Sequence, residues 1–140
     1  MKRILIGCVV VLLLALLVIG LQVLNRSAKR PFENLKVSQV KEIYLLEGDI
    51  IVYLDEEQQK DVLRMLSEID IYEIIEDPML EGGSADCSMH IVKKSGREFW
   101  VLPGSTHIII NGIFFRIDYN DDLMYYVTEI VEREIRDRKN

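Results

Sequence analysis

Residues 4–24 form an unbroken run without a charged side chain, unlike any later part of the chain. As an α-helix, these 21 residues would extend about 31 Å, which matches a bilayer hydrocarbon core of about 30 Å. The run therefore predicts a transmembrane anchor. Its main bilayer-facing residues are Ile4, Leu5, Ile6, Leu12, Leu13, Leu14, Leu16, Leu17 and Leu24.

Two other readings of the N-terminus are less consistent with the pattern. Val18-x-Gly20 is an acceptable signal-peptidase site, but apolar residues continue beyond it. Leu5-Ile6-Gly7-Cys8 has the letters of a lipoprotein box, yet the apolar run follows the cysteine instead of preceding it. We therefore expect an uncleaved anchor.

After the anchor, alternating apolar positions predict strands. Residues 41–46 and 50–54 are rich in aliphatic and aromatic side chains, and Glu47-Gly48-Asp49 between them predicts a hairpin turn. Residues 71–75 form a third run of this kind.

One helix is expected between the second and third strands. Asp55 is a suitable N-cap, and Gln58 is placed to complete a capping box. Its apolar stripe consists of Val62, Leu63, Leu66 and Ile69. The segment 77–86, which contains a proline and two glycines, predicts a long loop.

Two further hairpins are expected in the second half of the chain. If Ser95-Gly96 is a two-residue turn, Lys93 faces Glu98 in a favourable cross-strand pair. Asn111-Gly112 is the stronger turn signal. It pairs Ile110 with Ile113, Ile108 with Phe115, Ile109 with Phe114, and His107 with Arg116.

A final helix from about residue 121 to 138 completes the pattern. Its stripe is Leu123, Val127, Ile130, Val131 and Ile135. The chain therefore predicts an α+β fold, with an antiparallel sheet of about seven strands in ββαβββββα order and two packed helices. We divide it into an anchor with a short connector, 1–30, and one acidic α+β domain, 31–140.

Charge is distributed very unevenly along the chain. Residues 31–140 carry all 23 acidic residues but only 12 of the 17 basic ones, a net charge of −11. Such a domain repels phosphate backbones, which argues against nucleic-acid binding.

The orientation of the anchor in the membrane depends on the charges that flank it. Two basic residues precede the apolar run and three follow it closely, so the charge balance alone leaves the orientation open. Because a short basic N-terminus is hard to translocate, we expect it inside the cell and the domain outside.

Candidate chemistry is sparse. Cys87 and His90 are three residues apart, which on a strand places them on opposite faces. Together with His107 they form the one weak site that an envelope hydrolase could use. Two histidines without a closely spaced ligand do not predict a metal centre, and no phosphate-binding loop is present in the sequence. We expect no catalytic residue, no metal and no cofactor.

An apolar surface near the last hairpin is the best candidate for a binding role. If the helices cover one face of the sheet only, Trp100, Ile109 and Phe114 form an exposed patch beside polar His107 and Arg116. Exposed aromatic residues rimmed by polar groups are typical of protein contacts.

Several segments together carry a resemblance. They are Phe32-Glu33-Asn34-Leu35, Leu54-Asp55-Glu56-Glu57, Gly82-Gly83, Ile108-Ile109-Ile110-Asn111-Gly112 and the closing helix from Leu123. The chain resembles small uncharacterised membrane-anchored proteins of clostridial-type Gram-positive bacteria, which share a domain of unknown function. The resemblance implies location and fold class, and no active-site residue.

The expected function is therefore non-enzymatic binding of a protein or an envelope component by a membrane-tethered domain. An immunity- or inhibitor-type protein that masks a basic partner is an alternative, favoured by the acidic charge. A scaffold that oligomerises through its anchor is a third.

Overall fold

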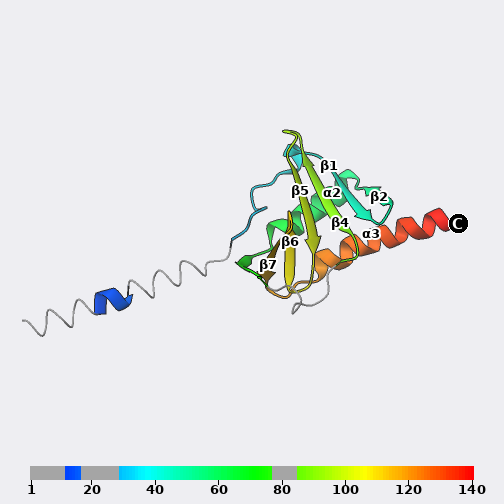
Figure 1. Cartoon of the computed structure of the whole chain (residues 1–140). Helices are drawn as coiled ribbons and strands as arrows, with labels where there is room; N and C mark the ends of the chain where they lie inside the picture. The colour runs from blue at the N-terminus through cyan, green and yellow to red at the C-terminus, as the bar shows by residue number, and fades with distance from the viewer. Residues whose placement is uncertain (1–11, 17–28, 77–84) are drawn as a thin grey trace, which may run out of the picture.

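The computed structural model describes residues 12–16, 29–76 and 85–140 (Figure 1). Its centre is one seven-stranded antiparallel sheet in the order β2-β1-β4-β5-β6-β7-β3. The strands are β1 (Val40–Glu47), β2 (Ile50–Tyr53), β3 (Ile71–Ile74), β4 (Ser88–Lys93), β5 (Glu98–Pro103), β6 (His107–Ile110) and β7 (Ile113–Ile117). The expected α+β class and the order of elements are confirmed.

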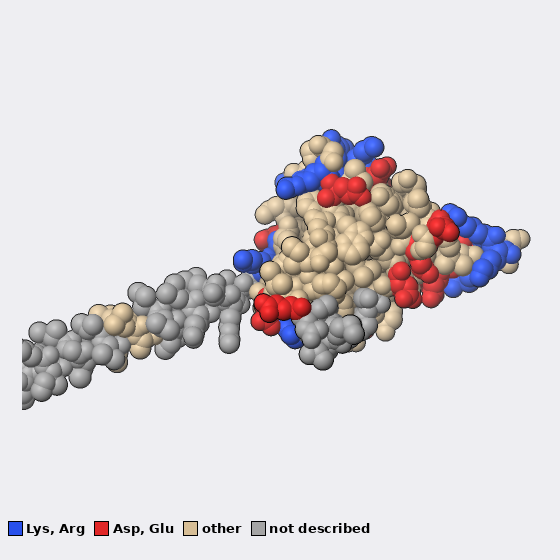
Figure 2. Space-filling view, in the orientation of Figure 1, with Lys and Arg blue, Asp and Glu red and all other residues tan. Residues whose placement is uncertain are grey.

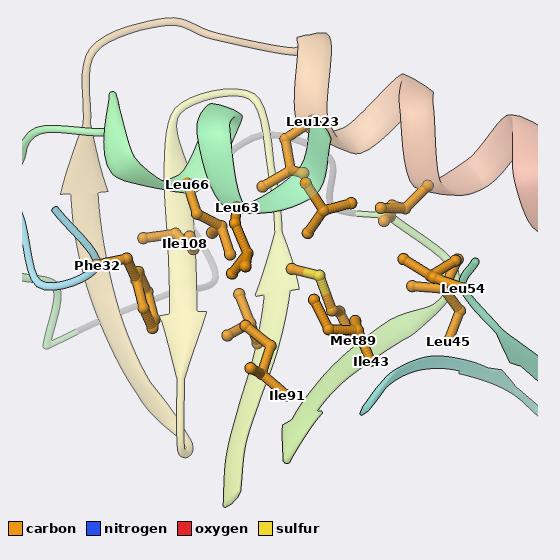
Figure 3. Close-up of a cluster of buried hydrophobic side chains, with 14 of the residues drawn as sticks. Phe32, Ile43, Leu45, Leu54, Leu63, Leu66, Met89, Ile91, Ile108 and Leu123 are labelled. Carbon is orange, nitrogen blue, oxygen red and sulfur yellow. The ribbon is translucent and has the colours of Figure 1, made fainter. Parts of the chain in front are cut away.

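Three helical elements accompany the sheet: the short 3-10 helix η1 (Val37–Gln39), α2 (Glu56–Ser67) and α3 (Asp122–Lys139). α2 and α3 pack on the same face of the sheet, where the helix stripes meet alternate strand residues in one core (Figure 3). The helices contribute Val62, Leu63, Leu66, Leu123, Val127 and Val131, and the strands contribute Ile43, Leu45, Met89, Ile91, Val101 and Ile108. Among the described residues, no helix covers the other face of the sheet.

The predicted start of α2 is confirmed in atomic detail. The Gln58 N–H donates to the Asp55 side chain at 2.9 Å, and the Asp55 N–H donates to the Gln58 side chain at 2.9 Å. This reciprocal capping box satisfies donors that the first helical turn leaves unpaired.

The register predicted for the β4–β5 hairpin is wrong by one residue. Glu98 pairs with Val92 instead of Lys93, and His90 pairs with Trp100. The loop has three residues, 94–96, because Gly96 takes a left-handed conformation with φ of 85° and the Lys93 N–H bonds to the Arg97 carbonyl. A type I turn followed by a left-handed glycine is the usual three-residue hairpin loop.

The β6–β7 hairpin has the predicted register. Its turn residues Asn111 and Gly112 have φ values of 51° and 83°, as a type I′ turn requires. The predicted pairs from Ile110–Ile113 to His107–Arg116 all occur. The ladder ends there and does not extend to Ser105 and Asp118, which the same register would pair.

Most of the expected anchor lies outside the described residues, as does the segment 77–84. Residues 12–16 are helical, and the side chains of Leu12, Leu13, Leu14 and Leu16 are exposed. Among the helices that the structure describes, none has the length and apolar character needed to cross a membrane. The chain enters the domain at Lys29, whose backbone pairs with Ile71 of β3.

Candidate functional site

The face of the sheet opposite α2 and α3 is the candidate functional surface, and we call it the open face. The pairing of the strands brings alternate residues together on it: Tyr53, Tyr44, His90 and Trp100 form one cross-strand row, and Ile51, Leu46 and Ser88 form the next. In Figure 1 the strands lie in front of α2, so Figure 2 shows this face. Its middle is uncharged, and the charged side chains lie toward its margins (Figure 2).

A hydrogen-bonded cluster on the open face connects β1, β4 and β5. His90 Nδ1 is 2.8 Å from Glu98 Oε1, and His90 Nε2 is 3.3 Å from the Ser88 hydroxyl oxygen. The Tyr44 hydroxyl donates to the same Glu98 oxygen at 3.1 Å. The Tyr44 and His90 rings stack with centroids 4.7 Å apart and planes inclined by 6°.

The electrostatics of this cluster follow from its hydrogen bonds. The pKa of Glu98 lies below its ordinary value of 4.5, chiefly because His90 and then Tyr44 donate hydrogen bonds to the carboxylate. Burial, followed by the neighbouring carboxylate, raises the pKa of Tyr44 above 10.0. Glu98 is therefore an ionised acceptor near neutral pH, and Tyr44 is a neutral donor.

The outer part of the row is more exposed. Tyr53 on the edge strand is 64% exposed, and its ring lies 5.6 Å from that of Tyr44. Ile51, two residues before it, is 43% exposed. Exposed aromatic and aliphatic side chains thus continue from this cluster to the β2 edge.

The five residues expected to form a partner surface all lie on the open face, but in different environments. Ile109 and His107 are buried, at 6% and 4% exposure. Trp100 and Phe114 are half-buried, and Arg116 is exposed in an ion pair of 2.8 Å with Glu73. The surface available to a partner therefore includes the two aromatic residues and Arg116, and it extends toward Tyr53 instead of His107.

The structure keeps the expected thiol and imidazole groups apart. Cys87 is buried in the core, whereas His90 belongs to the open face. Burial raises the pKa of the Cys87 thiol to about 11, so the thiolate is disfavoured. No group of three metal-binding side chains occurs among residues 12–16, 29–76 and 85–140.

A concave surface runs between α2 and α3. One hollow of about 370 Å³ is lined by Glu68, Asp122, Tyr125 and Glu129 among others. A neighbouring hollow of about 340 Å³ includes Asp55, Glu57, Asp61 and Arg133. Tyr126 lines both and donates to Asp61 at 3.2 Å. The groove is mainly acidic.

Sequence reasoning did not identify Tyr44, Tyr53, Ser88 and Glu98 as site residues. Ser88 and His90 are two residues apart on a strand. Because side chains alternate between the two faces of a strand, their position on one face could have been predicted from the sequence. The residue that faces Glu98 across the sheet depends on the length of the β4–β5 loop. The sequence predicted a two-residue turn, whereas the loop has three residues, so the neighbours of Glu98 were predicted wrongly.

Comparison with known proteins adds no family to this picture. No family model matches the chain, and no curated protein or solved structure matches it significantly.

Proposed function

We propose that this chain is a single-pass membrane protein whose acidic domain lies outside the cell and binds a partner through the open face. The observation that carries the proposal is the one-sided covering of the sheet. Both long helices pack on one face, while the other presents Tyr53, Ile51 and Trp100. Contiguous apolar surface of this kind on a small domain is typical of an interaction site.

The tether supports a location at the membrane. The run 4–24 is long enough to span a bilayer, and four residues separate it from Lys29, where the chain joins the sheet. A linker this short extends roughly 14 Å. The domain is then held close to the bilayer, and its net negative charge keeps it from lying flat on anionic headgroups.

A protein partner suits the open face better than a sugar chain. The Tyr44–His90 ring separation of 4.7 Å matches the strand spacing of about 4.8 Å. The two rings therefore stand upright on neighbouring strands and cover each other's faces. What they offer to solvent is mainly ring edges and polar tips, which suits interdigitating side chains more than a sugar ring stacked flat on a platform.

A basic partner held by the acidic α2–α3 groove is a second candidate, in line with an immunity- or inhibitor-type protein. It is favoured by the hollows that Asp61, Glu68 and Glu129 help to line. We expect neither surface to support catalytic turnover, and the resemblance to clostridial anchored proteins stays a prediction.

The location is tested by appending alkaline phosphatase to Asn140 and assaying whole bacterial cells. The enzyme is active only outside the cytoplasm, so the proposal expects activity. Inactive fusion protein recovered in the membrane fraction would place the domain inside.

The contact is tested by Tyr53→Lys, which puts a charge on the open face at an exposed position. We expect it to weaken partner binding without lowering the unfolding midpoint. The matched control is Tyr125→Lys on α3, since Tyr125 is 61% exposed and lies on the opposite side. Equal binding by both variants would contradict the proposed surface.

A further inference from the structure

We propose that Ser88 is a nucleophile activated by His90, and that it accepts an acyl group from a neutral carboxylic ester in a single transfer. This activity goes beyond binding, and the geometry of Ser88, His90 and Glu98 carries it. The three side chains form a chain of contacts of 3.3 Å and 2.8 Å on the open face.

The topology explains why the three residues meet. Ser88 and His90 are alternate residues of β4, so both point to the open face. His90 pairs with Trp100, which is two residues from Glu98 on β5. Glu98 is therefore the diagonal neighbour of His90 on the same face, within reach of a long side chain.

The hydrogen bonds assign the protons. Glu98 Oε1 accepts from the Tyr44 hydroxyl, and an ionised carboxylate can only accept, so His90 Nδ1 must donate to it. In the neutral ring, Nε2 then carries the lone pair and faces the Ser88 hydroxyl. This is the arrangement in which a histidine serves as a general base and a carboxylate orients it.

The ring of His90 is also held in position. It stacks on Tyr44 with an interplanar angle of 6°, and its side chain is only 15% exposed. A fixed ring keeps Nε2 directed at Ser88, which lowers the ordering needed when the reaction begins.

The transfer balances in atoms and charge. The Ser88 oxygen attacks the ester carbonyl while its proton moves to His90 Nε2. The bond from the carbonyl carbon to the alcohol oxygen then breaks, and the proton on Nε2 passes to that oxygen. The products are an acyl ester on Ser88 and a free alcohol.

The surroundings indicate the substrate class. Leu46 pairs with Ser88 on one side and with the exposed Ile51 on the other, which gives an aliphatic acyl group an apolar strip. The Glu98 carboxylate disfavours an anionic substrate. A neutral ester with a short aliphatic acyl chain fits both features.

The same surroundings make one transfer more favourable than repeated turnover. β4 lies between β1 and β5, so its backbone N–H groups form hydrogen bonds with the neighbouring strands. Among the described residues, they are therefore not grouped beside Ser88, where they could stabilise an oxyanion. Such donors contribute roughly 100- to 1000-fold to rate. The Ser88 hydroxyl also has a second acceptor, the Leu46 carbonyl at 3.4 Å. We therefore expect slow acylation and slow hydrolysis of the acyl-serine ester. With an activated ester, whose leaving group departs more readily than the serine alkoxide, acylation is the faster of the two steps and the acyl-serine accumulates.

The test uses the full chain in detergent micelles with p-nitrophenyl butyrate as the probe. We expect release of about one equivalent of nitrophenolate per chain, with the butyryl group mapped to Ser88 by mass spectrometry. Ser95 in the β4–β5 loop is the internal control, because it is exposed and has no histidine contact among the described hydrogen bonds. Butyrylation of Ser95 at the rate of Ser88 would overturn the proposal.

Two variants separate activation from simple exposure. His90→Gln should slow acylation of Ser88 about 100-fold, and an unchanged rate would refute the role of His90. Glu98→Gln should slow acylation of Ser88, because the imidazolium formed during transfer loses its carboxylate partner. An unchanged acylation rate in the folded variant would refute the role of Glu98. Because partner binding is assayed separately, failure here leaves the binding proposal standing.

Discussion

At the scale of single residues, two neighbours in the sequence have side chains on opposite faces of the sheet, and one is buried while the other reaches the surface. Cys87 enters the core, whereas Ser88 next to it lies on the open face beside His90. The alternation of side chains along a strand produces this separation. A nucleophile of this domain is therefore more readily a hydroxyl than a thiol.

The thiol of Cys87 should be inert in the folded protein. Burial raises its pKa to about 11, so the thiolate is rare near neutral pH and reagents cannot reach it. With Cys8 replaced by alanine, reaction with a thiol-specific chromogenic reagent at pH 8 should be complete only in denaturant. Rapid stoichiometric reaction without denaturant would show that the side chain is accessible.

Glu98 should make stability depend on acid pH. Its folded-state pKa lies below the ordinary 4.5, so its contribution is present above that pH and is lost as the pH falls further. We expect Glu98→Gln to lower the urea midpoint at pH 6 more than at pH 3. Glu57→Gln on exposed α2 is the control, and an equal loss at both pH values for Glu98→Gln would contradict the account.

At the scale of elements, local turn chemistry decided which predictions succeeded. Asn111 and Gly112 both tolerate positive φ, so a two-residue type I′ turn forms and the register follows. Ser95 is unfavourable at positive φ, so the neighbouring hairpin uses Gly96 alone and adds a residue to its loop. That single residue shifts Glu98 away from Lys93 and into contact with His90. The α2 cap and helix stripes were predictable because they depend on local spacing.

The capping box of α2 should be measurable as stability. Asp55→Ala removes the acceptor for the Gln58 N–H and should cost about 1 kcal/mol in the free energy of unfolding. Asp121→Ala is the matched control, because Asp121 precedes α3 without a side-chain cap hydrogen bond. Chemical denaturation of both variants measures this difference. An equal loss in the free energy of unfolding for both would show that the capping box does not stabilise the domain.

At the scale of the whole molecule, the sequence predicted the fold class and the order of elements, but it did not place Tyr44, Ser88 and Glu98 together on one face. Of the residues expected in the aromatic patch and its polar rim, Ile109 and His107 are buried, Trp100 and Phe114 are half-buried, and Arg116 is exposed. Burial within a half-covered sheet depends on all its strands together, and strand order could not be derived from local patterns. The exposed surface consequently lies nearer the β2 edge.

The central claim is that the open face meets a partner, and site-specific photo-crosslinking in living cells tests it most directly. A photoreactive phenylalanine analogue replaces either Tyr53 on the open face or Tyr125 beside the acidic groove, two tyrosines of similar exposure. We predict a discrete crosslinked adduct from position 53 and none from position 125. An adduct from position 125 alone would contradict the open-face account and favour a partner in the acidic groove.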